Sequence, residues 1–301
     1  MLLLRYLSIF SILIASPSFA WTNWVGVLED WPMTPNQTTA PADEKKSVGS
    51  GQEKSEVKND TQYEARVRPL FVRIDKKPWQ AAPRLQDSNP VVALPKAFSW
   101  DVCFGGRAEG QLTAMLEKEN EAGAKPPYLL RPEDRAPWRT KRSADYAGWL
   151  ATPVYKPILL KSSLSSSCVD PYKWRQATAD KSRSHLKQMI DELNKKMASP
   201  ESEADFYQFN EKDVRIHRTW ASVKHGLIVS IQTIPKSRKT ETFRILPSKE
   251  IHYLGSDMML VDAGDFDGDG ETEMLFKRHT ASQDIYDLYS DTKLLAESVW
   301  E

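Results

Sequence analysis

The sequence Val-Arg-Ile-His-Arg-Thr-Trp-Ala-Ser-Val-Lys-His-Gly-Leu-Ile-Val-Ser-Ile occupies residues 214–231 and changes its pattern halfway along. Residues 214–220 alternate between apolar and polar side chains, which is typical of a strand with one buried face. Residues 227–231 form a short, mostly apolar run, which indicates a strand buried on both faces. We therefore predict two neighbouring strands in this stretch.

Segments of the same kind recur from this point to the C-terminus. They are short and apolar, and they follow one another at intervals of roughly ten residues. They comprise residues 243–246, 251–254, 258–261, 274–276, 285–289 and 294–300. Many short strands at this spacing predict an all-β fold in which most strand pairs are antiparallel.

Toward the N-terminus, three further segments have strand character. Residues 21–33 and 67–74 are rich in aromatic and branched side chains, and residues 97–116 read as a hairpin that turns at Gly105-Gly106. One segment, between residues 182 and 199, has helical spacing instead. Its apolar side chains fall on a single stripe, which predicts one amphipathic helix that packs against the sheets; they are Leu186, Met189, Ile190, Leu193 and Met197.

The first 20 residues have the pattern of a secretory signal peptide. Arg5 precedes a short apolar run, and Ser18-Phe19-Ala20 places small residues at the positions that a signal peptidase requires. We predict cleavage after Ala20 and a secreted or periplasmic protein. Residues 34–62 contain almost no large apolar side chains and are predicted to be a disordered linker or long loop, so that residues 63–301 form the main β-rich domain.

Composition excludes some classes of protein. The chain has 41 basic and 41 acidic residues, so a nucleic-acid binder that works through excess positive charge is not expected. After the signal peptide no segment is apolar for long enough to cross a membrane. Motifs typical of serine hydrolases, zinc proteases and nucleotide-binding loops do not occur in the sequence.

The chain has two cysteines, Cys103 and Cys168. In an oxidising compartment two cysteines are most simply explained as one disulfide. Two buried free thiols are the alternative, because a free cysteine packs as a small apolar side chain.

One motif carries recognisable chemistry. Residues 262–276 read Asp-Ala-Gly-Asp-Phe-Asp-Gly-Asp-Gly-Glu-Thr-Glu-Met-Leu-Phe, with aspartates on alternate residues and a glycine where a sharp turn is needed. Calcium prefers six to eight oxygen ligands, and a curled loop with this spacing turns several carboxylates toward one point. The predicted ligands are Asp265, Asp267, Asp269, the Glu271 carbonyl and Glu273. Phe276 stands where an EF-hand has its bidentate glutamate, and residues 273–276 read as a strand.

This loop between two strands resembles the FG-GAP or VCBS repeat of β-propeller blades. The resemblance implies calcium ligation by the same five residues and a small, degenerate propeller-like fold, with a β-sandwich as the alternative. The chain is also similar to secreted bacterial proteins that carry one such repeat near the C-terminus.

The functional hypothesis that follows is a secreted or periplasmic, non-catalytic binding or scaffold protein with one structural calcium ion and an unknown protein or glycan ligand. Two alternatives stay open. One is an extracellular hydrolase acting on polysaccharide or peptidoglycan, which would need paired carboxylates that sequence spacing does not reveal. The other is a calcium-dependent adhesion module.

Overall fold

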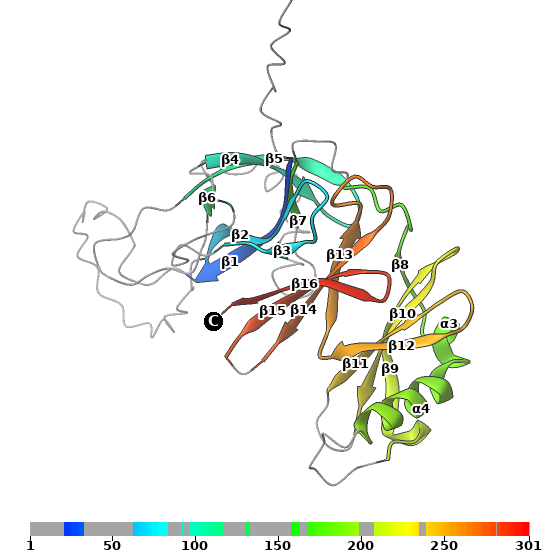
Figure 1. Cartoon of the computed structure of the whole chain (residues 1–301). Helices are drawn as coiled ribbons and strands as arrows, with labels where there is room; N and C mark the ends of the chain where they lie inside the picture. The colour runs from blue at the N-terminus through cyan, green and yellow to red at the C-terminus, as the bar shows by residue number, and fades with distance from the viewer. Residues whose placement is uncertain are drawn as a thin grey trace, which may run out of the picture.

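The architecture is that of a computed structural model, which describes residues 21–32, 63–83, 92, 97–116, 130–132, 158–162, 168–198, 208–234, 239–280 and 282–300. The predicted signal peptide (1–20) and the predicted linker (34–62) lie outside the described residues. Within the described ranges the strands form three sheets, and one of these sheets carries a long helix (Figure 1).

The N-terminal sheet contains seven strands in the order β1-β7-β4-β5-β6-β2-β3. Because β1 also pairs with β2, hydrogen-bonded neighbours can be followed from β1 through β7, β4, β5, β6 and β2 back to β1. The strands are β1 (Thr22–Pro32), β2 (Tyr63–Ile74), β3 (Gln80–Ala81), β4 (Ala97–Cys103), β5 (Ala108–Leu116), β6 (Leu130–Pro132) and β7 (Ile158–Ser162). The predicted hairpin at 97–116 is confirmed as β4 and β5.

Alternation along these strands gives the N-terminal sheet two apolar faces. Trp24 packs in one core cluster with Trp100 and Leu159, whereas Val25 and Leu160, their neighbours in the chain, belong to a second cluster. The first cluster packs on one face of the sheet, and the second packs on the opposite, outer face. An outward apolar face needs a partner, which the C-terminal sheet provides.

The C-terminal sheet is an antiparallel meander of four strands. These are β13 (Met259–Gly264), β14 (Glu273–His279), β15 (Asp284–Ser290) and β16 (Lys293–Trp300). Leu275 and Leu288 pack on the N-terminal sheet, while Phe276 and Tyr289 turn the other way, toward Trp220. Burial on both faces explains why residues 274–276 and 285–289 read as short apolar runs.

The helix-covered sheet contains β8 (Arg175–Ala177), β9 (Val214–Ser222), β10 (Gly226–Thr233), β11 (Thr240–Ile245) and β12 (Ile251–Ser256). Helices α3 (Asp180–Arg183) and α4 (Leu186–Met197) precede β9, as does the 3₁₀ turn η2 (Glu211–Asp213). Met189, Ile190 and Leu193 are buried on α4, and they belong to one core cluster with Val229 and Phe243 of the sheet. The predicted amphipathic helix and its packing role are therefore confirmed.

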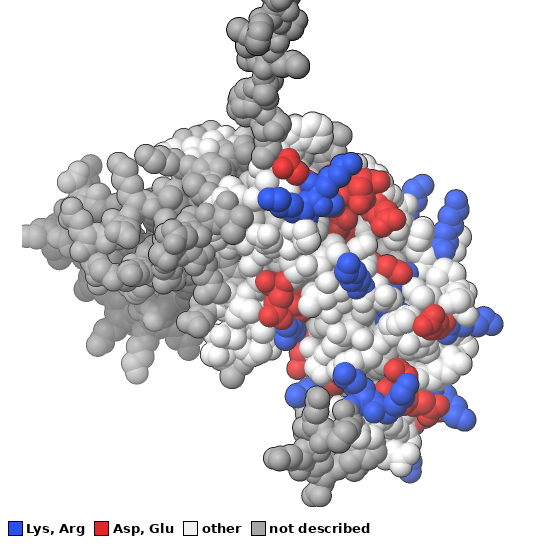
Figure 2. All heavy atoms as spheres, viewed as in Figure 1, with Lys and Arg blue, Asp and Glu red and all other residues white. Residues whose placement is uncertain are grey.

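The all-β, mostly antiparallel fold class is confirmed as well, because every strand pair in the three described sheets is antiparallel. The two sheets nearest the C-terminus are meanders, as propeller blades are, while the face-to-face packing of successive sheets is that of a sandwich. No helix in the described ranges combines the length and apolar character that crossing a membrane requires. Acidic and basic side chains are interspersed over the face in Figure 2.

Candidate metal centre

The acidic loop, residues 265–272, connects β13 to β14. These strands are neighbours, and their ladder ends at the pair Gly264 and Glu273, so the loop leaves and re-enters the sheet at one point. Both strands are buried on two faces, which holds the two ends of the loop firmly in place. The sequence therefore builds a rigid base beneath a short, strongly acidic turn.

Three of the predicted ligands come together in this loop. Asp265, Asp267 and Asp269 each offer a carboxylate oxygen, and these three oxygens lie within 4.8 Å of one another. Asp265 is only 8% exposed, and its Oδ1 atom has no hydrogen-bond partner among the described residues. A buried carboxylate oxygen without a donor is unfavourable, so this atom is free to bind a cation.

Hydrogen bonds within the loop fix the direction of the aspartates. Asp267 Oδ1 accepts from the Asp269 backbone N–H (3.2 Å), and Asp269 Oδ1 accepts from the Glu271 N–H (2.8 Å). Asp265 Oδ2 accepts from the Gly270 N–H at 3.1 Å. Gly270 has a φ of 88°, which only glycine adopts without strain, so the predicted need for a sharp turn here is confirmed.

Glu273 lies under the loop rather than within the group of three. Its side chain is buried, and Oε2 accepts from the Phe266 backbone N–H at 2.6 Å. Burial, reinforced by the negative charges of Asp269 and Asp265, raises the pKa of Glu273 to about 8. Burial likewise raises the pKa of Asp265. Glu271 is exposed, and the ligand roles of its carbonyl and of the Glu273 carboxylate stay predictions.

The N-terminal sheet contributes residues that the sequence analysis did not find. The Arg73 guanidinium of β2 forms an ion pair with Asp267 Oδ2, and the Asn23 side chain of β1 donates to the Asp267 carbonyl at 3.4 Å. Asp267 is thus held by two strands that lie about 200 residues or more away in the chain. No local pattern in the sequence marks such long-range partners.

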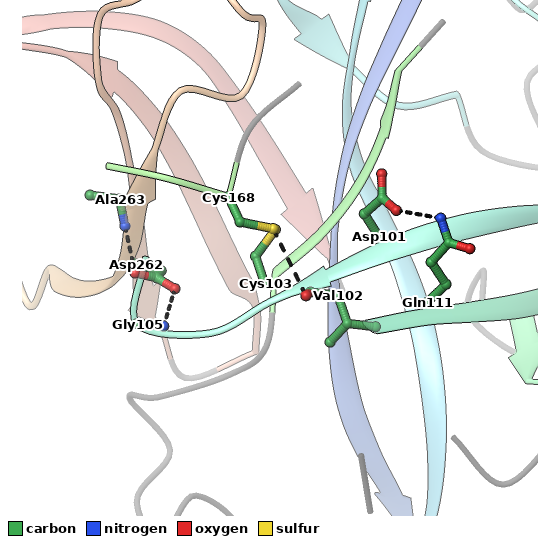
Figure 3. The surroundings of a disulfide bond; sticks show 8 residues. All are labelled: Asp101, Val102, Cys103, Gly105, Gln111, Cys168, Asp262 and Ala263. Atoms are coloured by element: carbon green, nitrogen blue, oxygen red, sulfur yellow. Dashed lines mark hydrogen bonds between the residues drawn. A yellow bond between two sulfur atoms is a disulfide. The ribbon is translucent and has the colours of Figure 1, made fainter. Parts of the chain in front are cut away.

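The predicted disulfide between Cys103 and Cys168 is present (Figure 3). Both cysteines belong to one core cluster with Phe266 of the acidic loop. Just beyond Cys103, the backbone N–H of Gly105 donates to Asp262 Oδ2 at 2.8 Å. Asp262 also accepts from the Ala263 N–H through Oδ1, and burial raises the pKa of Asp262 to about 6. The first aspartate of the motif therefore joins the β4–β5 turn to β13, which is a structural role.

The chemistry of this donor set fits a hard cation. The three clustered side chains offer only carboxylate oxygens, which suit calcium, magnesium and manganese rather than soft metals. Cysteine and histidine are not members of the group. The site can therefore hold a divalent metal ion, and the identity of that ion is a separate question.

No family model matches this chain, and no curated protein or solved structure matches it either.

Proposed function

We propose that this chain is an exported, non-catalytic binding or scaffold protein whose C-terminal sheet is stabilised by one calcium ion. The observation that carries the proposal is the convergence of Asp265, Asp267 and Asp269, with one buried carboxylate oxygen left without a donor. We further propose that residues 262–276 form a single repeat of the FG-GAP or VCBS type, with β13, the acidic loop and β14 as its parts.

Calcium is the ion that we favour among hard cations. The loop offers several carboxylates on an irregular turn, and calcium accepts irregular shells of six to eight oxygens, whereas magnesium demands near-ideal octahedral geometry. Calcium is also plentiful outside the cell, so a site with a dissociation constant on the order of 10⁻⁴–10⁻³ M would be occupied there. In this role the ion stabilises the strand–loop–strand corner rather than taking part in a reaction.

Two features support export. A disulfide between the chain's two cysteines is typical of oxidising compartments. The signal-peptide pattern of residues 1–20 gives a route to such a compartment.

The direct test compares thermal unfolding of the mature chain in 5 mM calcium and in chelator. For a dissociation constant of about 0.3 mM, calcium at this concentration stabilises the folded state by about 1.7 kcal/mol. In a domain of this size that corresponds to an increase in Tm of about 5 °C. Asp269→Asn is the informative variant, because asparagine can still accept the Glu271 N–H but no longer supplies a negative charge. We expect the variant to lose most of the increase.

Asp180→Asn is the matched control, because the Asp180 side chain is exposed on α3 far from the loop in sequence and structure. It should keep the full calcium effect. Equal melting curves with calcium and with chelator for the wild type would contradict the metal site. An equal effect of magnesium would contradict the assignment to calcium.

The non-catalytic part of the proposal is tested separately. A glycan array and a panel of polysaccharide and peptidoglycan substrates are applied to the purified mature chain. We expect no turnover. Cleavage of any of these substrates that is lost on replacing a carboxylate would favour the extracellular hydrolase instead.

A further inference from the structure

The disulfide anchors a short stretch of chain, residues 168–172, that lies against the acidic loop. Cys103 is the last residue of β4, and its partner Cys168 opens the stretch (Figure 3). Both cysteines are buried, and they share a core cluster with Phe266 of the acidic loop and Leu275 of β14. The covalent link therefore fixes residues 168–172 against the same packing that supports the loop.

Residues 168–172 contact both ends of the acidic loop. At the first end, the Val169 carbonyl accepts from the backbone N–H of Asp265 at 3.2 Å. At the second end, the Thr272 hydroxyl donates to Asp170 Oδ1 at 2.8 Å and accepts from the Tyr172 backbone N–H at 3.1 Å. These contacts hold the first aspartate of the site and the residue next to Glu273.

Asp170 is itself held in one position, so it can fix the position of Thr272 in the acidic loop. It is 4% exposed, and its carboxylate also accepts from the backbone N–H groups of Tyr172 (2.9 Å) and Trp174 (2.6 Å). Thr272 is 1% exposed, so its bond to Asp170 is shielded from water. A buried hydrogen-bond network of this kind holds one arrangement of the backbone rather than several.

We propose that the Cys103–Cys168 disulfide is a positioning element of the cation site, so that its oxidation strengthens metal binding by the acidic loop. The inference rests on the proposed metal site. With the disulfide formed, residues 168–172 hold Asp265 and Thr272 at the spacing that the ion requires. With the two thiols reduced, residues 168–172 are no longer covalently linked to β4. Metal binding must then also order the loop, which weakens the observed affinity.

Linkage makes the proposal quantitative. If oxidation raises calcium affinity by a given factor, calcium raises the equilibrium constant for forming the disulfide by the same factor. The redox reaction is an exchange in which the reduced protein and oxidised glutathione give the protein disulfide and two molecules of reduced glutathione. Couplings between sites commonly lie between about 5-fold and 150-fold, and we expect about tenfold here. Tenfold corresponds to a change of about 30 mV in the reduction potential of a two-electron couple.

The first experiment measures calcium binding by calorimetry on the oxidised mature chain and on the variant Cys103→Ser/Cys168→Ser. Circular dichroism establishes that both are folded. We expect calcium to bind the oxidised chain about ten times more tightly. Equal affinities in the two folded proteins would overturn the positioning role while leaving the metal site intact. No calcium binding by the oxidised wild type would overturn both, so the two failures are distinguishable.

A second pair of variants keeps the test valid if the serine variant does not fold. Thr272→Val removes the hydroxyl that joins the loop to Asp170 but leaves the disulfide in place. Its control is Thr242→Val, the same change at a buried threonine of β11 whose hydroxyl donates to the Met258 carbonyl. We expect several-fold weaker calcium binding in the first variant and wild-type binding in the second. Wild-type affinity in Thr272→Val would overturn the proposal.

The reciprocal measurement separates positioning from general stability. The oxidised fraction of the protein is titrated in glutathione buffers with calcium or with chelator, under conditions in which the reduced chain remains folded. We expect calcium to move the midpoint by about 30 mV in favour of the disulfide, and we expect no movement in Asp269→Asn. An equal midpoint with and without calcium in the wild type would overturn the coupling.

Discussion

Replacing Arg73 with glutamine should make the protein more dependent on calcium. Arg73 forms an ion pair with Asp267, whose side chain is only 3% exposed. In the ion-free protein this guanidinium compensates a buried negative charge within the acidic loop. When calcium binds, the ion itself compensates that charge, so the arginine matters less.

The burial of the two side chains sets the expected magnitude. Removing one partner of a fully buried ion pair costs about 3–5 kcal/mol, and exposed pairs contribute about 0–1 kcal/mol. The Arg73 side chain is 22% exposed, so we expect an intermediate loss of about 2 kcal/mol in chelator. In saturating calcium the loss should fall to about 1 kcal/mol or less. The calcium-induced increase in Tm should therefore be larger in Arg73→Gln than in the wild type, by about 3 °C.

Differential scanning calorimetry in calcium and in chelator measures the stability of each protein and its calcium-induced increase in Tm. Arg183→Gln is the control, because Arg183 pairs with Asp180 at a position where both side chains are about three-quarters exposed. It should change neither the stability nor the calcium effect. A smaller calcium effect in Arg73→Gln than in the wild type would refute the reasoning, because it would mean that Arg73 helps the ion to bind.

Two further predictions concern the rest of the fold. Burial raises the pKa of Asp262 to about 6, so its ionised form opposes folding, and this penalty disappears as the pH falls from above 6 toward 4. When the pH falls from 7 to 4 in chelator, the free energy of unfolding of the wild type should therefore rise relative to that of Asp262→Asn. We expect a relative gain on the order of 2 kcal/mol, measured by urea unfolding. Parallel pH curves for the two proteins would contradict this. Gly226→Ala should lower the free energy of unfolding by about 3 kcal/mol or more, also measured by urea unfolding. Gly226 has a φ of 92°, and a Cβ atom there would lie 2.2 Å from the Ile245 carbonyl oxygen. Near-wild-type stability would contradict the register of β10 on β11.

Most of the strands were predictable because local pattern decides them. The alternation at 214–220 and the apolar run at 227–231 became β9 and β10, and the helical stripe became α4. The pairing of β1 with β2 and β7 was not predictable, because strands that pair across long separations leave no periodic signal. The short strands β3, β6 and β8 were missed, since two or three residues are too few to show a periodic pattern.

The residues of the candidate site also fall into a predictable and an unpredictable group. Asp265, Asp267 and Asp269 could be predicted because their spacing alone curls them toward one point. Arg73 and Asp170 could not, because each reaches the loop only through tertiary packing across roughly a hundred residues or more of chain. Sequence analysis therefore identified the three carboxylates that cluster and missed the groups that hold them in position.

The packing explains why an ion would matter at this corner. Strands β13, β14 and β15 of the C-terminal sheet are largely buried, so they cannot move away from the acidic loop without separating from a neighbouring sheet. The loop between β13 and β14 nevertheless brings three carboxylates together above the buried Glu273. Among the described contacts, one guanidinium, that of Arg73, forms an ion pair with this group. A divalent cation would remove most of the remaining repulsion in a loop whose two ends are held by packed strands, so its effect should extend to unfolding of the whole sheet rather than to the loop alone.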